Sequence, residues 1–194
     1  LSGSANLQKT FGKIKSTLGV RASLSKSIST LASLRDTDNN PNTPPVRVEE
    51  ERDSRNFSQT YSVGISSNFR TAPNFDLGYN VTINDYNQGG NINKFYTHSP
   101  YLNLDILFLK DFTFTSRYTY NNYKNETQTL NNYSFLDLDL TYQKKDSKWE
   151  YALKMTNAMN TTSINRDNTN AIFNSTSTYV IQPRFTVFSV KYNL

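Results

Sequence analysis

The sequence of 194 residues contains no cysteine and only one histidine, His98. The missing cysteines exclude disulfides, thiolate metal sites and a cysteine nucleophile. A single histidine excludes zinc sites built from several histidines and disfavours histidine-based acid–base catalysis. The longest apolar run, at 106–109, is far shorter than the roughly 20 residues of a transmembrane helix. No signal peptide is apparent, and neither a metal centre nor a membrane-spanning helix is expected.

Polar amides and hydroxyls dominate what is present, with 25 Asn, 22 Thr and 21 Ser. The mean hydropathy is −0.66, yet 13% of the residues are aromatic. Because disordered chains are poor in aromatic residues, this composition argues against disorder. The net charge is +5, but Lys and Arg are scattered, so nucleic acid is not an expected partner. Two classes fit: a soluble all-β protein and a transmembrane β-barrel that is apolar on alternate residues.

Alternation of apolar and polar residues is the dominant pattern along the chain. It predicts eight strands and a possible ninth at 1–11. The eight lie at 14–24, 57–69, 75–85, 101–110, 112–120, 134–142, 149–157 and 184–194. In the strand at 134–142, Leu136, Leu138 and Leu140 alternate with Asp137 and Asp139. We expect the leucine face of this strand to contact lipid and the aspartate face to line an interior.

The connections between these strands alternate in length. Short connections fall at 12–13, 70–74, 110–111 and 144–147, and long ones at about 34–56, 86–100, 121–133 and 158–179. This pattern predicts an antiparallel meander with all tight turns at one end. Bacterial outer-membrane barrels keep short turns in the periplasm and long loops outside. The C-terminus is therefore expected on the periplasmic side.

Three features favour a membrane barrel over a soluble β-sandwich. The polar faces carry mostly Thr, Ser, Asn and Gly, where a sandwich usually carries Lys and Glu. The strands are about nine to eleven residues long, which matches a tilted crossing of the bilayer. Aromatic residues gather toward strand ends, where a membrane interface places amphipathic rings. These are Phe112, Tyr120, Tyr142, Trp149 and Tyr192. The predicted fold class is all-β, a transmembrane antiparallel β-barrel with eight to nine strands in this chain.

The last strand, at 182–194, resembles the closing strand of an outer-membrane barrel. Its alternate apolar positions, Phe188, Val190, Tyr192 and Leu194, match the C-terminal signal that barrel-assembly machinery reads.

Two other regions resemble TonB-dependent receptors, in particular the type that carries a carboxypeptidase regulatory domain. The segments 142–149 and 156–161 are similar to the penultimate strand of these barrels and the N-x-x-N motif that follows it, here Asn157 and Asn160. The stretch 95–100, before the strand that contains Leu102, fits the same group.

The resemblance implies an outer-membrane barrel of about 22 strands with an N-terminal plug domain. Residues 1–194 would form a C-terminal part of the barrel wall, without the plug. The implied function is import of a ligand across the outer membrane, with no cofactor. The implied partners are outer-membrane lipid, lipopolysaccharide, the barrel-assembly machinery, TonB and a surface lipoprotein. Two alternatives stay open: a structural or assembly subunit of an outer-membrane complex, and a complete eight-stranded anchor or adhesin barrel.

Charged residues on the polar strand faces are the candidate site. Arg117, Asp137, Asp139 and Lys154 are predicted to face the barrel interior, with the carboxylates paired to Arg117 or Lys154. Two carboxylates at this spacing could also serve catalysis, but ion pairing in a wet lumen is the interpretation we favour. His98 is expected at a loop–strand junction in a surface or turn role. The charged run at 49–53 is expected in a solvated loop. No catalytic residue, metal ligand or enzymatic activity is predicted.

Overall fold

The computed structural model describes residues 1–35, 46–69, 73–88, 91–169 and 174–193, and the fold is given for these residues. They form eleven β-strands, in agreement with the all-β prediction. The strands are β1 (Ser2–Phe11), β2 (Ile14–Arg35), β3 (Val46–Ser67), β4 (Asn74–Gln88), β5 (Asn91–Phe108), β6 (Phe112–Asn125), β7 (Thr129–Tyr142), β8 (Trp149–Thr156), β9 (Ser163–Thr169), β10 (Asn174–Val180) and β11 (Phe185–Tyr192). The described residues contain no helix long and apolar enough to cross a membrane.

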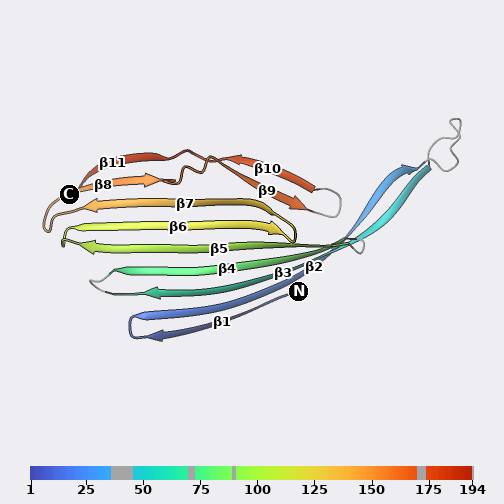
Figure 1. The fold of residues 1–194 in the computed structure, drawn as a ribbon, viewed down its shortest axis with the longest axis horizontal. Coiled ribbons are helices and arrows are strands. Elements are labelled where there is room, and N and C mark those ends of the chain that lie inside the picture. Colours follow the sequence, from blue (N-terminus) through green and yellow to red (C-terminus); the bar gives the residue numbers. More distant parts are fainter. Residues whose placement is uncertain (36–45, 70–72, 89–90, 170–173, 194) are drawn as a thin grey trace.

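Nine strands form one antiparallel sheet in the order β1-β2-β3-β4-β5-β6-β7-β8-β11, and β9 and β10 form a separate hairpin. The β1–β2, β5–β6 and β7–β8 turns, and the facing ends of β3 and β4, lie at one end of the sheet, beside the C-terminus (Figure 1). We call this end the turn end and the opposite one the hairpin end. The predicted meander, with its tight turns at one end, is confirmed.

The tight turns use residues in the left-handed region of the backbone. Gly12 has a φ of 60° between β1 and β2, and Leu109 and Lys110 have φ values of 50° and 66° between β5 and β6. The backbone N–H of Gln143 donates to the carbonyl oxygen of Asp111 over 2.9 Å, so the β7–β8 turn is tied to the β5–β6 turn. Positive φ fits tight hairpin loops, of two residues between β1 and β2 and of three residues between β5 and β6.

The register brings the apolar side chains of the nine-stranded sheet to one face, which we call the apolar face. One row on this face runs across five strands. Its members are Ile106, Phe114, Leu140, Leu153 and Phe188, each opposite the next. On the other face, the polar face, Asp105 lies opposite Thr115, Thr115 opposite Asp139, and Asp139 opposite Lys154. The predicted division of the strand at 134–142 into a leucine face and an aspartate face is confirmed.

The sheet has no core of large side chains. Among the described residues, no large side chain is fully buried, and the core consists of Ala152, which is 6% exposed. On the apolar face, Leu153 is 45% exposed and Phe188 is 64% exposed. The fold is therefore held by strand pairing, and the described residues leave the apolar face uncovered.

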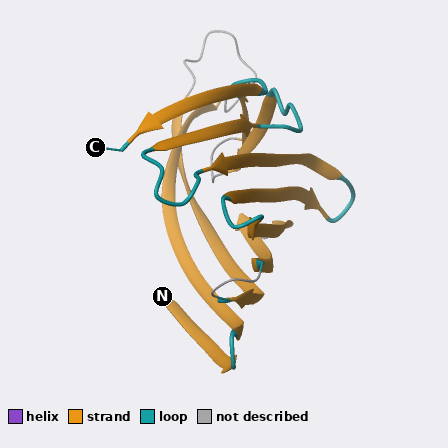
Figure 2. Ribbon diagram, turned by 90° about the vertical axis from the view of Figure 1, so that its left-hand side faces the viewer, coloured by secondary structure: helices purple, strands orange, loops and turns teal. Residues whose placement is uncertain are grey.

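The sheet is open within the described part of the chain. Its edges are β1 and β11, which pair with β2 and β8 and not with each other. Figure 2 shows that the sheet curves between these two edges, which carry the N- and C-terminal ends. Closure into a barrel and a wall of about 22 strands both stay predictions.

The predicted long connections are mostly strand, so these assignments were wrong. β2 and β3 extend to Arg35 and from Val46, and each is 22 residues long, well beyond the predicted length. The same correction applies at 86–100, 121–133 and 158–179, which contain parts of β4 to β7 and the β9–β10 hairpin. In these segments the regular alternation of apolar and polar residues in the sequence disappears, although backbone pairing continues. Parts of the predicted connections, at 36–45, 70–72, 89–90 and 170–173, lie outside the described residues.

β2 and β3 continue past their neighbours as a two-stranded ribbon. The pairing of β1 with β2 begins at Ser2 and Ser23, and that of β3 with β4 ends at Ser54 and Gln88. Beyond these points β2 and β3 pair with each other as far as Arg35, and the ribbon projects from the hairpin end (Figure 1).

A glycine on the polar face permits close side-chain packing. Gly78 on β4 lies opposite Tyr101 on β5, and a Cβ atom at Gly78 would overlap the tyrosine ring. The hydroxyl of Tyr101 donates to Oδ1 of Asp76 over 3.5 Å. The ring can therefore lie flat over the β4 backbone because position 78 has no side chain.

We predict that Gly78→Val lowers the free energy of unfolding by about 1–3 kcal/mol, because the new side chain must displace the Tyr101 ring. Gly3→Val is the matched control, since a Cβ at Gly3 meets nothing within 4 Å. Urea unfolding of both variants measures the difference. The double variant Gly78→Val with Tyr101→Ser should recover most of the loss, and equal effects at positions 3 and 78 would contradict the packing.

Candidate functional site on the polar face

Four charged side chains gather on the polar face of β6, β7 and β8. Arg117 lies opposite Asp137, and Asp139 lies opposite Lys154, in adjacent strand pairs. All four line one open pocket of about 280 Å³. The structure thus brings together the four residues that the sequence predicted to share a face.

The predicted ion pair is present between Asp139 and Lys154. The lysine Nζ lies 2.9 Å from Oδ2 of the aspartate, and the lysine side chain is 57% exposed. Thr141 on the same strand donates its hydroxyl to Oδ1 of Asp139 over 3.0 Å. An ion pair this exposed contributes at most about 1 kcal/mol to stability. Its main effect is to fix the positions of both charges in the pocket.

Arg117 does not complete the second predicted pair. Asp137 faces it across the β6–β7 pair, but Oδ1 of Asp137 accepts the backbone N–H of Asn157 over 2.9 Å. Within the described part of the chain, Arg117 forms no ion pair. Its planar guanidinium is therefore the group in this pocket that is available to a carboxylate or phosphate.

Asn157 forms the buried polar junction beside this pocket. Its side chain is 3% exposed, and its φ of 54° turns the chain out of β8. Its amide nitrogen donates to the carbonyl oxygens of Thr161 and Gln182 over 2.8 and 2.9 Å. Its amide oxygen accepts the backbone N–H of Thr161 over 3.0 Å. One side chain therefore joins the end of β8 to the segments on either side of the β9–β10 hairpin.

The rest of the N-x-x-N motif completes the junction. Asn160 also has a left-handed backbone, with a φ of 56°, and its Oδ1 accepts the backbone N–H of Arg184 over 3.1 Å. The hydroxyl of Thr161 donates to the carbonyl oxygen of Ser134 over 2.6 Å, which ties the turn to β7. The sequence pattern located the motif, but its role as a junction of β7, β8 and β11 emerges from these contacts.

An aromatic border runs from β5 to the C-terminal strand β11 at the turn end of the apolar face. Stacked or tilted rings at centroid separations of 4.7–6.5 Å cross five strands, which we call the aromatic ladder. Its members are Phe108, Phe112, Tyr142, Tyr151 and Phe188. Trp149 and Tyr192 form a further edge-to-face pair at 4.9 Å. Of the predicted C-terminal signal, Phe188, Val190 and Tyr192 lie on the exposed apolar face of β11, and Leu194 lies outside the described residues.

His98 differs from its predicted position. It lies within β5, where it is opposite Val81 on the apolar face, and not at a loop–strand junction. Its Nδ1 is 2.6 Å from the hydroxyl of Tyr79, and the two rings stack at 6.1 Å. The strand signal was hidden because Pro100, two residues on, suggested a loop. Pro100 has no N–H to donate, and the hydroxyl of Ser99 instead donates to Oδ1 of Asn121 over 2.8 Å across the β5–β6 pair.

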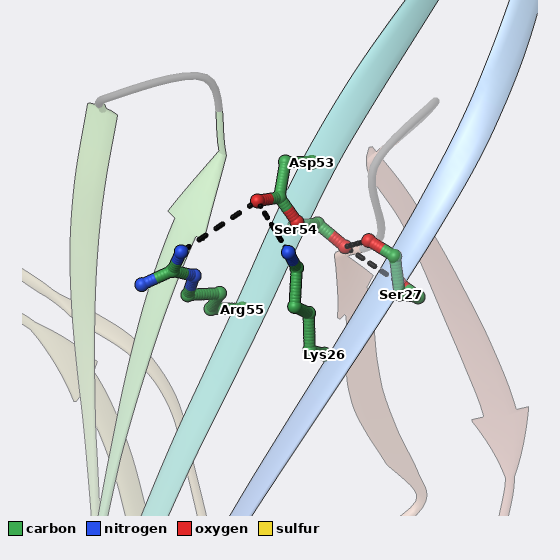
Figure 3. Close-up of polar contacts among 5 residues, drawn as sticks. All are labelled: Lys26, Ser27, Asp53, Ser54 and Arg55. Carbon is green, nitrogen blue, oxygen red and sulfur yellow. Dashed lines mark hydrogen bonds and ion pairs between the residues drawn. The ribbon is translucent and has the colours of Figure 1, made fainter.

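The charged run at 49–53 also differs from prediction, because it lies in β3 and not in a loop. Asp53 is within 3.1 Å of Nζ of Lys26 and within 3.7 Å of a guanidinium nitrogen of Arg55 (Figure 3). The neighbouring hydroxyls of Ser27 and Ser54 are 2.7 Å apart. The side chains of residues 50 and 52 lie outside the described set.

Comparison with known proteins gives a structural likeness but no family. No protein-family model matches the chain, and no curated protein matches it. The fold is similar to that of OmpT, an outer membrane protein of Vibrio cholerae, with 10% sequence identity and a TM-score of 0.47. The match covers 98% of this chain and 56% of OmpT, so the chain spans about half the length of that protein.

We predict that Asn157→Gly lowers the free energy of unfolding by at least about 2 kcal/mol. Glycine keeps the left-handed backbone but leaves buried partners of the amide without hydrogen bonds. Asp146→Gly is the control, because Asp146 has a φ of 63° in an exposed turn. It should change stability by less than about 0.5 kcal/mol. Chemical denaturation measures both, and equal losses would show that backbone geometry, not the amide, holds the junction.

Proposed function

We propose that this chain forms part of the wall of an outer-membrane β-barrel of the TonB-dependent receptor type, which imports a ligand and does not catalyse a reaction. One observation carries the membrane assignment. Nine paired strands present a continuous, exposed apolar face on one side and a polar face on the other. In water, apolar patches above a few hundred Å² are rare on monomeric proteins.

A lipid environment fits both the apolar face and the paired backbone of such a sheet. Hydrocarbon tails cover the apolar face, and strand pairing satisfies the backbone N–H and C=O groups that lipid cannot solvate. The alternation of apolar and polar residues along each strand is the pattern of transmembrane barrels. The aromatic ladder at the turn end matches the ring of aromatic side chains at a membrane–water interface. In this orientation the turn end faces the periplasm.

The open edges favour a larger wall over a small anchor barrel. In a bilayer, the free N–H and C=O groups of β1 and β11 need partner strands. Bacterial single-chain barrels have an even number of strands, whereas this sheet has nine. We therefore propose that further strands pair with both edges, as in a barrel of about 22 strands.

The receptor type rests on the polar face and on the C-terminal region. Arg117 and the Asp139–Lys154 pair would line the barrel interior, where the guanidinium could contact a plug domain or an anionic ligand. The buried junction at Asn157 shows that the N-x-x-N motif has a structural role close to the last strand. A structural subunit derived from such a receptor is the second candidate, and the last experiment below separates the two.

The membrane assignment predicts recovery of the native protein in the outer-membrane fraction. It should need detergent for extraction and should migrate faster on gels before heating than after, because a closed barrel resists unfolding by cold detergent. A monodisperse species in detergent-free supernatant would refute the assignment.

The face assignment predicts opposite effects at two adjacent positions of β7. Leu138→Arg should lower the stability of the inserted protein by about 2–4 kcal/mol, because the arginine would face hydrocarbon. Asp139→Asn should leave it nearly unchanged, because position 139 faces the wet interior. Urea unfolding in lipid vesicles gives both values. Greater sensitivity at 139 than at 138 would mean that the faces are inverted.

The receptor assignment requires partners beyond residues 1–194. The native outer-membrane protein should be longer than 22.2 kDa, and a segment N-terminal to this region should crosslink to TonB in cells. A longer protein that crosslinks to other outer-membrane subunits and not to TonB would favour the structural role.

A further inference from the structure

The apolar face ends in basic residues at the hairpin end. On four strands, the first charged side chain past the apolar run on this face is a cation. These are Lys26 on β2, Arg55 on β3, Lys94 on β5 and Lys124 on β6. We call them the cationic border. On β4 the corresponding residue is Asp85, which lies opposite Lys94.

The border follows the slope of the apolar face. Lys26 lies directly opposite Arg55, just beyond the apolar pair Leu24 and Phe57. Asp85 lies opposite both Phe57 and Lys94, so these three residues form one cross-strand row. This row is two residues closer to the turn end than Arg55. Lys124 lies opposite Tyr96, which is two residues closer still to the turn end than Lys94. Because barrel strands are tilted, positions at one depth in the membrane shift along successive strands. The shift of the cations from β2 to β6 therefore keeps them at one depth.

The cations of β2 and β3 share one carboxylate and keep a net positive charge. Lys26 and Arg55 both approach Asp53, and their side chains are 49% and 60% exposed (Figure 3). Farther out on the ribbon, Glu51 and Glu49 occupy the same face of β3. Among the side chains that the structure describes, this face of β3 therefore carries acidic residues directly beyond Arg55.

Lys124 also has a defined position at this limit. Its Nζ lies 5.9 Å from the centroid of the Tyr96 ring, on the apolar face. A lysine above an interfacial aromatic ring can keep its stem against apolar surface and its ammonium group in the polar headgroup layer.

We propose that the cationic border binds the phosphate groups of lipid A, the bisphosphorylated glycolipid of the outer leaflet. This inference rests on the proposed function, which places the hairpin end outside. Charge complementarity carries it: the acyl chains of the lipid would contact the apolar face while its phosphates meet cations directly above. At the turn end, by contrast, Lys13, Lys110, Lys144 and Lys145 lie in or next to turns. Two other cations reach rings of the apolar face near its edges at this end, Lys9 over Phe11 and Lys148 over Tyr192.

The test uses the full-length protein, purified from outer membranes, and two variants with matched charge loss. The border variant combines K26Q, R55Q, K94Q and K124Q. The control variant combines K13Q, K110Q, K144Q and K145Q, which lie in or next to turns. Bisphosphorylated lipid A, lipid A without phosphates, and phosphatidylglycerol are each titrated into detergent-solubilised protein, and native mass spectrometry measures the bound lipid.

The border variant should bind bisphosphorylated lipid A about fivefold more weakly for each cation removed. The control variant should bind it as the wild type does, and removal of the phosphates should abolish the difference between the two. Equal binding by both variants, or a preference for phosphatidylglycerol at matched charge, would overturn the proposal. Both variants must keep their faster migration before heating, which separates lost binding from lost folding. Failure of the proposed function differs again, because no protein would then be recovered from outer membranes.

Discussion

Cross-strand register is the constraint on which the rest of this structure depends. The described residues bury almost no large side chains, so the order of the sheet comes from backbone pairing and from which side chains that pairing places together. The row from Ile106 to Phe188 is apolar across five strands because the register of every pair places an apolar residue opposite an apolar residue. A slip of one residue at any pair would send the following strands to the opposite face. Register therefore defines both surfaces of the sheet at once.

The C-terminal region needs a second device, because the chain leaves the sheet between β8 and β11 to form the β9–β10 hairpin. A short turn between β8 and β11 would by itself hold β11 beside β8. Here the Asn157 amide holds both sides of the detour, and Asp137 on β7 accepts the backbone N–H of the same residue. Asp137 makes this hydrogen bond and does not form an ion pair with Arg117 on the polar face. The same junction thus fixes the last strand and leaves one cation available in the neighbouring pocket.

The two limits of the apolar face differ in chemistry, which gives the sheet a direction relative to a membrane. The turn end is bordered by the aromatic ladder, and the hairpin end by the cationic border. Aromatic rings suit an interface of mixed polarity, whereas ammonium and guanidinium groups suit a layer of phosphates. The two-stranded ribbon of β2 and β3 extends beyond the cationic border. The same two strands continue past the border without a change of backbone structure.

The sequence by itself determined the strands within the apolar band, their faces and the end at which the tight turns lie. Alternation is a local signal, and a strand with one apolar and one polar face must alternate, so the strand predicted at 149–157 has nearly the bounds of β8, Trp149–Thr156. Alternation could not determine where the strands end, since it becomes irregular in residues 86–100 and 121–133 and pairing there depends on the neighbouring strand. The strand position of His98, the capture of Asp137 by Asn157 and the alignment of four cations along one border were likewise decided by tertiary structure. Each depends on residues that are distant in the chain and become neighbours once the register between strands is set.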